Sequence, residues 1–235
     1  MRLRPFFSYY GSKYTIIEKY PKPETETIIE PFSGSAQYAT RYPHKKVILY
    51  DLDENIYQVW RYLINVSEKE ILSIDLDFDH VDDSTLSQEQ KILCGFWISQ
   101  AAATPRKTKT DRAKKNSILW AHRVASQLKY IRHWKIYHMS YDEIPDHVGT
   151  WFIDPPYIKK GIYYKESSEN IDYANLRKWC LERKQYHIVC ENIGADWMDF
   201  SPLCALKNSK NKQTREAIFT NIPNRQLSLF EETRT

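Results

Sequence analysis

The chain has few of the features that mark secreted, metal-binding or membrane proteins. Its four cysteines follow no C-x-x-C or other metal-ligand spacing, and its seven histidines show no ligand spacing either. No signal peptide and no long apolar run is evident in the 235 residues. We therefore expect a soluble protein of a reducing cytoplasm, without structural zinc or another bound metal.

Internal repeats and low-complexity tracts are also lacking, and the length fits one domain with room for a sizeable insertion. The net charge is only +4, but its distribution is uneven. Between Thr104 and Lys135 there are ten Lys or Arg residues and one acid, Asp111, which gives a local net charge of +9. Such a block predicts a polyanion partner such as nucleic acid, although a solvated helix face would have the same composition.

The stretch from Trp151 to Tyr157 reads Trp-Phe-Ile-Asp-Pro-Pro-Tyr and carries the strongest chemical signal. Its three apolar residues of high strand propensity predict a buried strand. Two prolines end that strand, because each lacks an N–H and fixes its own φ at about −65°. Pro155 also keeps Asp154 out of the helical region. A carboxylate, a carbonyl and an aromatic ring are thereby held together at the carboxyl end of a strand, where open α/β sheets bind ligands.

These groups suit an exocyclic amine such as N6 of adenine. If Asp154 accepts one amine hydrogen and the Pro155 carbonyl accepts the other, the nitrogen is drawn toward a tetrahedral shape and can attack a carbon electrophile. The carboxylate disperses the positive charge that develops on the nitrogen. Tyr157 can stack on the base, which contributes about 1–3 kcal/mol. The alternative is a proline-rich strand exit with a surface acid and a packing tyrosine.

Two earlier strands are also predicted to end in acids. The run Thr27–Ala36 predicts a strand, a sharp turn and a helix start, where small residues admit a ligand and Glu30 can pair with an ammonium. No Gly-Lys-Ser/Thr follows it, so it is not a P-loop. A second strand ends at Asp51, at the spacing of an acid that binds the ribose of a nucleoside cofactor. Asp53 is predicted to cap the next helix. An ordinary strand–turn–helix is the alternative.

The rest of the chain fits the same strand–helix alternation, which predicts an α/β fold. The N-terminal run Tyr9–Lys13 predicts a turn in which Gly11 allows close approach of a ligand and Lys13 meets a carboxylate or a phosphate. We predict further strands at 136–138, 187–190 and 216–221, a helix at 173–185 and a loop over a substrate at 159–170.

Residues 67–135 interrupt the alternation and are predicted to be mainly helical. A capped short helix follows Ser67, longer helices are expected at 88–103 and 116–134, and a basic loop at 105–112 lies between them. We interpret this region as an insertion that holds DNA through its phosphates. The predicted DNA contacts are Arg106, Lys107, Lys109, Arg112, Lys114 and Lys115.

In this order the features resemble those of the Dam-type (alpha-group) DNA adenine-N6 methyltransferases of bacteria and phages, from about Arg4 to Asn221. The run Tyr9–Lys13 is similar to the aromatic–x–Gly–Gly–Lys segment of that family, and Glu30–Ser35 resembles its cofactor loop. The tetrapeptide Asp154–Tyr157 equals the family's catalytic motif. Two positions depart from the pattern, since Ser12 and Ala36 each replace a glycine. Both replacements are small, so we expect cofactor binding to survive.

The resemblance implies a Rossmann-like methyltransferase fold with a mainly helical target-recognition insertion, S-adenosyl-L-methionine as cofactor, and an adenine flipped out of duplex DNA. Residues 1–66 and 136–221 would form the catalytic domain, 67–135 the insertion and 222–235 a tail. The implied catalytic residues are Asp154, Pro155, Pro156 and Tyr157. The implied cofactor contacts are Tyr9, Tyr10, Lys13, Glu30, Phe32, Gly34, Asp51, Tyr141 and Asp154.

The tail at 222–235 contains a second motif, which indicates a protein partner. Its Gln-Leu-Ser-Leu-Phe sequence closely resembles the short motif by which bacterial replication proteins dock on the sliding clamp. The implied contacts are Gln226, Leu227, Leu229 and Phe230. A tail that packs on its own domain is the alternative.

Other functions remain open at this stage. An RNA adenine-N6 or cytosine-N4 methyltransferase, or a non-enzymatic DNA-binding or clamp-associated protein on the same scaffold, would share much of the pattern. The intact tetrapeptide and the acid Asp51 favour an enzyme, and Asp154 favours adenine because cytosine enzymes of this kind usually have Ser there. Restriction–modification, regulation and protection of a mobile element are all compatible roles, in a bacterial cell or in the host cytoplasm of a phage.

Overall fold

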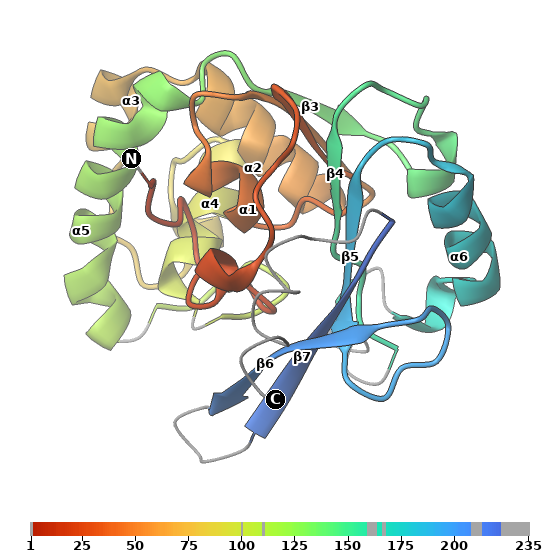
Figure 1. Cartoon of the computed structure of the whole chain (residues 1–235). Coiled ribbons are helices and arrows are strands. Elements are labelled where there is room, and N and C mark those ends of the chain that lie inside the picture. The colour runs from red at the N-terminus through yellow and green to blue at the C-terminus, as the bar shows by residue number, and fades with distance from the viewer. Residues whose placement is uncertain are drawn as a thin grey trace.

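The computed structural model describes residues 2–99, 101–109, 111–158, 164–165, 168–207 and 213–221, with the backbone alone for 111–116, 205–207 and 213–215. Within these residues one seven-stranded sheet forms the centre (Figure 1). The strands are β1 (Thr27–Glu30), β2 (Lys46–Asp51), β3 (Lys135–His138), β4 (Thr150–Ile153), β5 (His187–Asn192), β6 (Ser201–Lys207) and β7 (Gln213–Thr220). The α-helices are α1 (Gln37–Arg41), α2 (Glu54–Asn65), α3 (Glu68–Leu72), α4 (Gln88–Ile98), α5 (Asp111–Gln127) and α6 (Tyr173–Glu182). Short 3-10 helices are η1 (Ile17–Lys19), η2 (Val81–Asp83), η3 (Leu128–Tyr130), η4 (Tyr141–Glu143) and η6 (Ser168–Asn170).

The strand order is β3-β2-β1-β4-β5-β7-β6. Strands β1 to β5 are parallel, β7 is antiparallel to β5, and β6 is antiparallel to β7. The chain runs outward from β1 to β3 and then returns to β4 to fill the other half of the sheet. This reversal makes the junction of β1 and β4 the topological switch point, where open α/β sheets bind their ligands. The predicted α/β fold is therefore confirmed.

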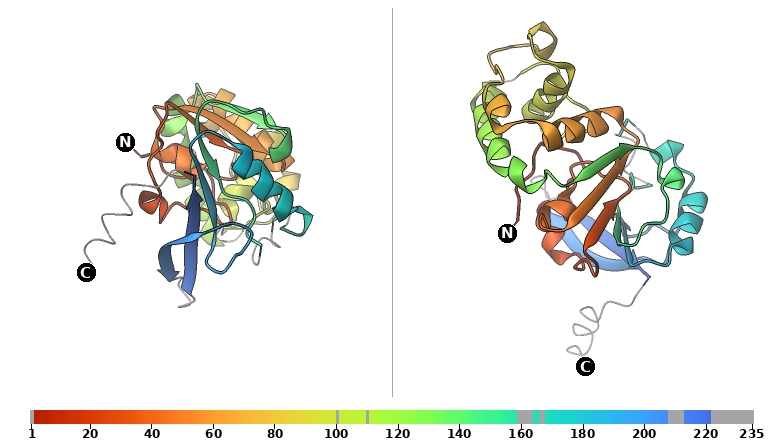
Figure 2. Two further views of the ribbon diagram at one scale, coloured as in Figure 1. Left: turned by 45° about the vertical axis from the view of Figure 1, so that its right-hand side comes forward. Right: turned by 90° about the horizontal axis from the view of Figure 1, so that it is seen from above.

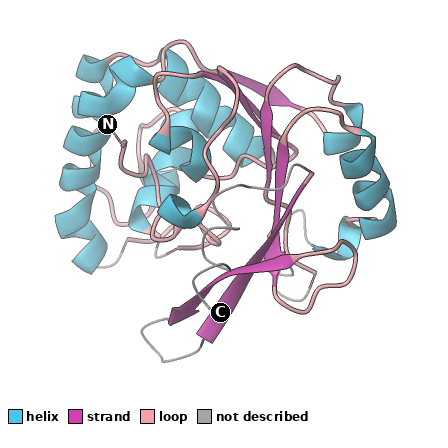
Figure 3. Ribbon diagram, viewed as in Figure 1, coloured by secondary structure: helices cyan, strands magenta, loops and turns pink. Residues whose placement is uncertain are grey.

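Side chains of successive strand residues alternate between two apolar layers, as a sheet covered on both faces requires. Ile28 and Leu49 belong to the layer packed with α1 to α5, whereas Ile29 and Val189 belong to the layer packed with α6. Figure 2 shows α6 on one face of the sheet and α2, α4 and α5 on the other, and Figure 3 shows the strands between them. At the start of α2 the Asp53 side chain accepts from the Asn55 N–H at 2.9 Å, so the predicted cap is confirmed.

The helices of residues 67–135 share the core on the first face of the sheet. In α4, Phe96 stacks on Phe7 with ring centroids 5.1 Å apart, and Trp97 Nε1 donates to the Phe6 carbonyl at 2.9 Å. The predicted helical character of this region is confirmed, and its helices are joined to the N-terminal segment by one continuous core.

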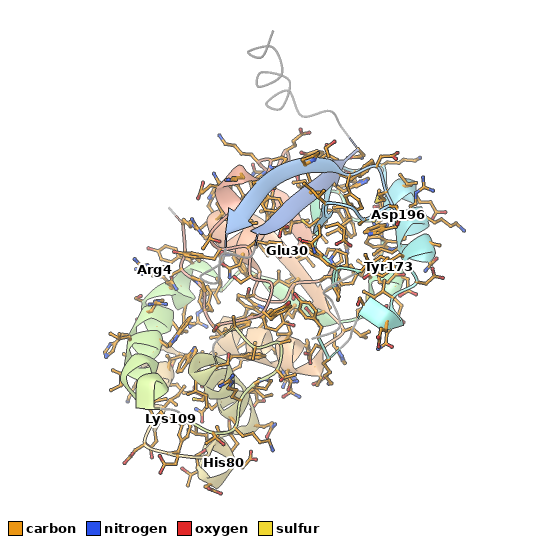
Figure 4. The ribbon with its side chains drawn as sticks, turned by 90° about the horizontal axis from the view of Figure 1, so that it is seen from below. Arg4, Glu30, His80, Lys109, Tyr173 and Asp196 are labelled. Atoms are coloured by element: carbon orange, nitrogen blue, oxygen red, sulfur yellow. The ribbon has the colours of Figure 1, made fainter. Side chains whose placement is uncertain are left out.

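The basic loop lies against the acidic stretch at 75–83. The Lys109 N–H donates to the Asp79 carbonyl at 2.9 Å, and Lys107 forms an ion pair with Asp82 at 2.7 Å. Figure 4 shows Lys109 at one end of the molecule. Part of the positive charge of the block is therefore offset by acids of the same chain.

Three predicted helices have wrong boundaries. The helix expected at 88–103 ends at Ile98, because Ser99 has an extended backbone and its hydroxyl donates to the Phe96 carbonyl at 3.0 Å. The helix expected at 116–134 begins earlier, at Asp111, and ends at Gln127, where a 3-10 turn takes over. The helix expected at 173–185 ends at Glu182.

One strand was not predicted. Strand β6 contains Pro202, which lacks an N–H and argues against a strand in the middle of a sheet. Here β6 is the edge strand of the order, and its ladder shifts register between Pro202 and Cys204. An edge strand can carry a proline because one of its sides has no ladder to complete.

The cysteines of the described residues are free, with Cys94, Cys180 and Cys190 buried. No helix in the described ranges is long and apolar enough to cross a membrane.

Candidate active site

A pocket lies at the switch point, beside the carboxyl ends of β1, β2 and β4. The loops that follow β1 to β4, the N-terminal run Tyr9–Lys13 and residues 164–165 and 170–171 line it. Figure 4 shows Glu30 near the centre of the molecule. All nine residues predicted to contact the cofactor line this one pocket, namely Tyr9, Tyr10, Lys13, Glu30, Phe32, Gly34, Asp51, Tyr141 and Asp154.

Asp51, at the end of β2, holds the loop that follows β1. Its Oδ2 accepts from the Gly34 N–H at 2.8 Å and from the Ser33 hydroxyl at 3.2 Å, and its Oδ1 accepts from the Asp53 N–H at 3.0 Å. Burial raises the pKa of Asp51 to about 6, although these hydrogen bonds act in the opposite direction. The acid is therefore fixed in orientation on the wall of the pocket.

The loop after β1 has the left-handed backbone that its small residues suggested. Gly34 has φ +42°, and a Cβ there would approach the Tyr9 ring to 3.0 Å. Ala36 has φ 47° and ψ 45°, a conformation that costs a residue with a Cβ about 1–2 kcal/mol and costs glycine none. Ser12 has no positive φ. Of the two departures from the family pattern, only that at Ala36 therefore falls where the backbone favours glycine.

Two aromatic rings pack against each other on one side of the pocket. The centroids of Phe32 and Tyr141 are 5.5 Å apart with an angle of 31° between the rings. Tyr141 is held from behind, since the Asn175 side-chain amide donates to its hydroxyl at 3.2 Å. A planar ligand ring fits such aromatic surroundings.

Glu30 is only 2% exposed, and burial raises the pKa of its carboxyl well above the usual range. Its Oε1 accepts from the Ala39 N–H of α1 at 2.7 Å. One carboxylate oxygen thus holds α1 in place, while the residue still lines the pocket.

Asp154 of the tetrapeptide forms a largely buried ion pair with Lys13. Lys13 Nζ lies 2.9 Å from Asp154 Oδ2, and the two side chains are 8% and 20% exposed. Burial by itself would lower the pKa of Lys13, but the charges of Asp154 and Glu216 raise it above its usual value. Burial raises the pKa of Asp154, and Lys13 opposes that shift. The carboxylate that Lys13 was expected to contact is therefore Asp154 of the same chain.

Tyr157 has a different environment from the one expected. Its ring is 9% exposed and is not part of the pocket lining, whereas Pro156 is. Lys13 Nζ lies 4.6 Å from the centroid of the Tyr157 ring. The hydroxyl donates to Glu216 Oε2 of β7 at 2.6 Å. Stacking on a base, as predicted for this ring, requires Lys13 to move or the base to approach another part of the ring.

The sequence analysis did not select Tyr164, which lines the pocket, or Glu216, which contacts the tetrapeptide. Glu216 is an acid in an otherwise apolar part of β7, which was a signal that could have been used. Tyr164 lies over Gly11, its hydroxyl donates to the Tyr10 carbonyl at 3.3 Å, and its ring lies 6.0 Å from that of Tyr9. It belongs to the loop predicted to lie over a substrate, of which residues 159–163 and 166–167 are outside the described part.

The other predicted site residues lie away from this pocket or outside the description. Arg106 and Lys107 are exposed in the basic loop. The side chains of Arg112, Lys114 and Lys115 are outside the described part, and so are the tail residues Gln226, Leu227, Leu229 and Phe230. Across the described residues, no group of three or more His, Cys, Asp or Glu side chains could hold a metal ion.

Comparison with known families gives a result for the first part of the chain. Residues 9–90 match the D12 class N6 adenine-specific DNA methyltransferases, and this stretch contains the N-terminal turn, the loop after β1 and Asp51. The resemblance found in the sequence is therefore confirmed. The chain matches no curated protein.

The buried ion pair leads to a stability prediction. Asp154→Ala should lower the free energy of unfolding by about 3 kcal/mol, because it leaves the Lys13 ammonium buried without its nearest carboxylate. The double variant Lys13→Met/Asp154→Ala should recover most of that loss. Urea unfolding measures both.

The control is Glu26→Ala, which removes an 84% exposed partner of Lys45 and should change the free energy of unfolding by less than about 1 kcal/mol. Equal losses in the single and double variants would show that the pair contributes nothing.

Proposed function

We propose, from the match of residues 9–90 to the D12 class N6 adenine-specific DNA methyltransferases, that the chain transfers a methyl group from S-adenosyl-L-methionine to N6 of an adenine flipped out of duplex DNA. One observation carries the proposal. The carboxylates of Asp51 and Asp154, from strands on either side of the switch point, line the same pocket together with the aromatic pair Phe32 and Tyr141.

The residues present fit S-adenosyl-L-methionine. Asp51 is a fixed acid at the end of β2, the position that binds ribose hydroxyls in open α/β sheets. Phe32 and Tyr141 offer ring faces to an adenine, and the buried Glu30 offers a carboxyl to an ammonium. Gly34 keeps the loop backbone free of a Cβ where the Tyr9 ring lies close.

The proposed chemistry depends on position and charge. When bound, S-adenosyl-L-methionine supplies a methyl group on a positively charged sulfur. Asp154 accepts one hydrogen of the target amine and the Pro155 carbonyl accepts the other, which directs the lone pair of N6 toward the pocket. The Asp154 carboxylate stabilises the positive charge that develops on N6, in a site where it is only 20% exposed to water. Pro156 lines the pocket, and Tyr157 is buried with its ring beside Lys13.

We predict that Asp154→Asn lowers methyl transfer by about 10²–10³-fold, because the neutral amide cannot stabilise the developing charge. Transfer of a tritiated methyl group to plasmid DNA measures this. Asp196→Asn makes the same change at an exposed acid and should keep wild-type turnover. More than about a tenth of wild-type turnover in Asp154→Asn would rule out this role.

The same assay with total RNA in place of plasmid DNA tests which nucleic acid is the substrate. Long-read sequencing of DNA from an expressing, methylation-deficient bacterium identifies the methylated site.

For DNA binding we propose that the basic loop and the start of α5 contact phosphates. Arg106 is exposed, whereas Lys107 is paired with Asp82. Arg106→Ala should therefore flatten the dependence of log Kd on log salt by about 0.9 for each phosphate that the variant no longer neutralises, and Asp82→Asn should make it steeper by freeing Lys107. Fluorescence anisotropy of a labelled duplex over a range of salt concentrations measures the slopes.

Lys178→Ala is the matched control, because it removes an exposed charge of α6 on the opposite face of the sheet. Its slope should equal that of the wild type. If Arg106→Ala and Lys178→Ala give the same slope, the loop is a solvated surface and DNA is held elsewhere.

The tail is proposed to dock on a bacterial sliding clamp, which would hold the enzyme near newly made DNA. A fluorescent peptide of residues 222–235 should bind purified clamp with a Kd of the order of micromolar. A peptide with Gln226, Leu229 and Phe230 changed to Ala should not bind. No binding, or equal binding by both peptides, would remove the clamp as a partner.

A further inference from the structure

Glu216 is a buried acid that the reaction proposed above does not use. It lies in β7, opposite Asn192 of β5, and is 4% exposed. Its neighbours Ala217 and Ile218 are apolar and buried. A carboxylate in such a place loses its hydration and needs hydrogen bonds or a positive charge in return.

Its hydrogen bonds come from tyrosines. The Tyr157 hydroxyl donates to Glu216 Oε2 at 2.6 Å, the length of a charge-assisted O–H···O bond. The Tyr20 hydroxyl donates to the same oxygen at the longer distance of 3.3 Å. Tyr157 is the last residue of the tetrapeptide, so the β6–β7 hairpin is connected to the active site through this bond.

A positive charge lies on the same side. Lys13 Nζ is 4.6 Å from the centre of the Tyr157 ring and 2.9 Å from Asp154. The negative charges of Asp154 and Glu216 both raise the pKa of Lys13. Lys13 is therefore in contact with the half-buried Asp154 and with the Tyr157 ring, whose hydroxyl is bonded to the buried Glu216.

This arrangement bears on how a base enters. The target amine must either displace the Lys13 ammonium from Asp154 Oδ2, with which it is in contact at 2.9 Å, or bind to the other carboxylate oxygen. The face of the Tyr157 ring lies 4.6 Å from the same ammonium, so the position of that ring also bears on where Lys13 lies. A ring that receives a base must also be held at a fixed angle, because small errors in the position of reacting groups reduce rates strongly.

We propose that Glu216 is a positioning residue for methyl transfer: through the hydroxyl it fixes the Tyr157 ring, over which the Lys13 ammonium lies. The proposal rests on the function proposed above. Glu216 does not line the pocket and would act through Tyr157.

The test compares Glu216→Gln, Tyr157→Phe and the double variant. Glu216→Gln should lower kcat by about tenfold to a hundredfold, with KM for DNA changed by less than about threefold. Tyr157→Phe removes only the hydroxyl and should lower kcat less. The double variant should equal Glu216→Gln, since the hydroxyl acts through the carboxylate. Cofactor affinity, measured by calorimetry with S-adenosyl-L-methionine, should equal that of the wild type in all three.

Tyr20→Phe is the matched control, because it removes the weaker hydroxyl donor from the same oxygen and does not line the pocket. It should keep kcat within about twofold of the wild type. A fluorescent adenine analogue, 2-aminopurine, placed at the methylated site should report weaker base capture by Glu216→Gln than by Tyr20→Phe.

Three outcomes would overturn the proposal: full turnover by Glu216→Gln, multiplied losses in the double variant, or the same loss in Tyr20→Phe as in Glu216→Gln. Urea unfolding of each variant separates misfolding from mispositioning, and Tyr157→Phe still tests the contact if Glu216→Gln does not fold. An inactive wild-type enzyme that binds no cofactor would instead contradict the function proposed above and is recognised before any variant is made.

Discussion

The ion pair between Lys13 and Asp154 is the contact on which the rest of the site depends. It joins the N-terminal segment to the end of β4, and both side chains are largely out of water. Because each charge needs the other when water is excluded, the segment that carries Lys13 is held against the strand that carries the tetrapeptide. Asp51 also joins two segments of the pocket wall, because its carboxylate accepts hydrogen bonds from Ser33 and Gly34 in the loop after β1. The pocket is thus built around half-buried acids, each with a partner from another part of the chain.

In the helical region at 67–135, some of the basic residues are paired with other groups of the same chain. Its block of ten basic residues looks uniform in the sequence, yet Lys107 is paired with Asp82 and Arg132 donates to the Ile64 carbonyl at 2.6 Å, near the end of α2. Such residues stabilise the fold and contribute less to a surface for phosphates. The exposed Arg106 remains the clearest candidate for contact with DNA.

Much of the fold was predictable because its signals are local. The acids Asp51 and Asp154 follow short apolar strands, and Asp53 caps α2 as its position suggested. Where prediction failed, the deciding contact came from elsewhere. Strand β6 contains a proline and is a strand only because it pairs with β7 at the edge of the sheet, and α4 stops at a backbone turn that no periodicity marks.

The sequence alone determined the type of sheet, the residues of the pocket and the tetrapeptide at the end of β4, because strand patterns and proline stops act over a few residues. Only the tertiary structure decided that Lys13 faces Asp154, that the Tyr157 ring is covered, and that Glu216 lies behind it. Fifty-nine positions separate Tyr157 from Glu216, and the pairing of β7 with β5 brings them together. Contacts between residues so far apart depend on how the whole sheet assembles, which no local pattern specifies.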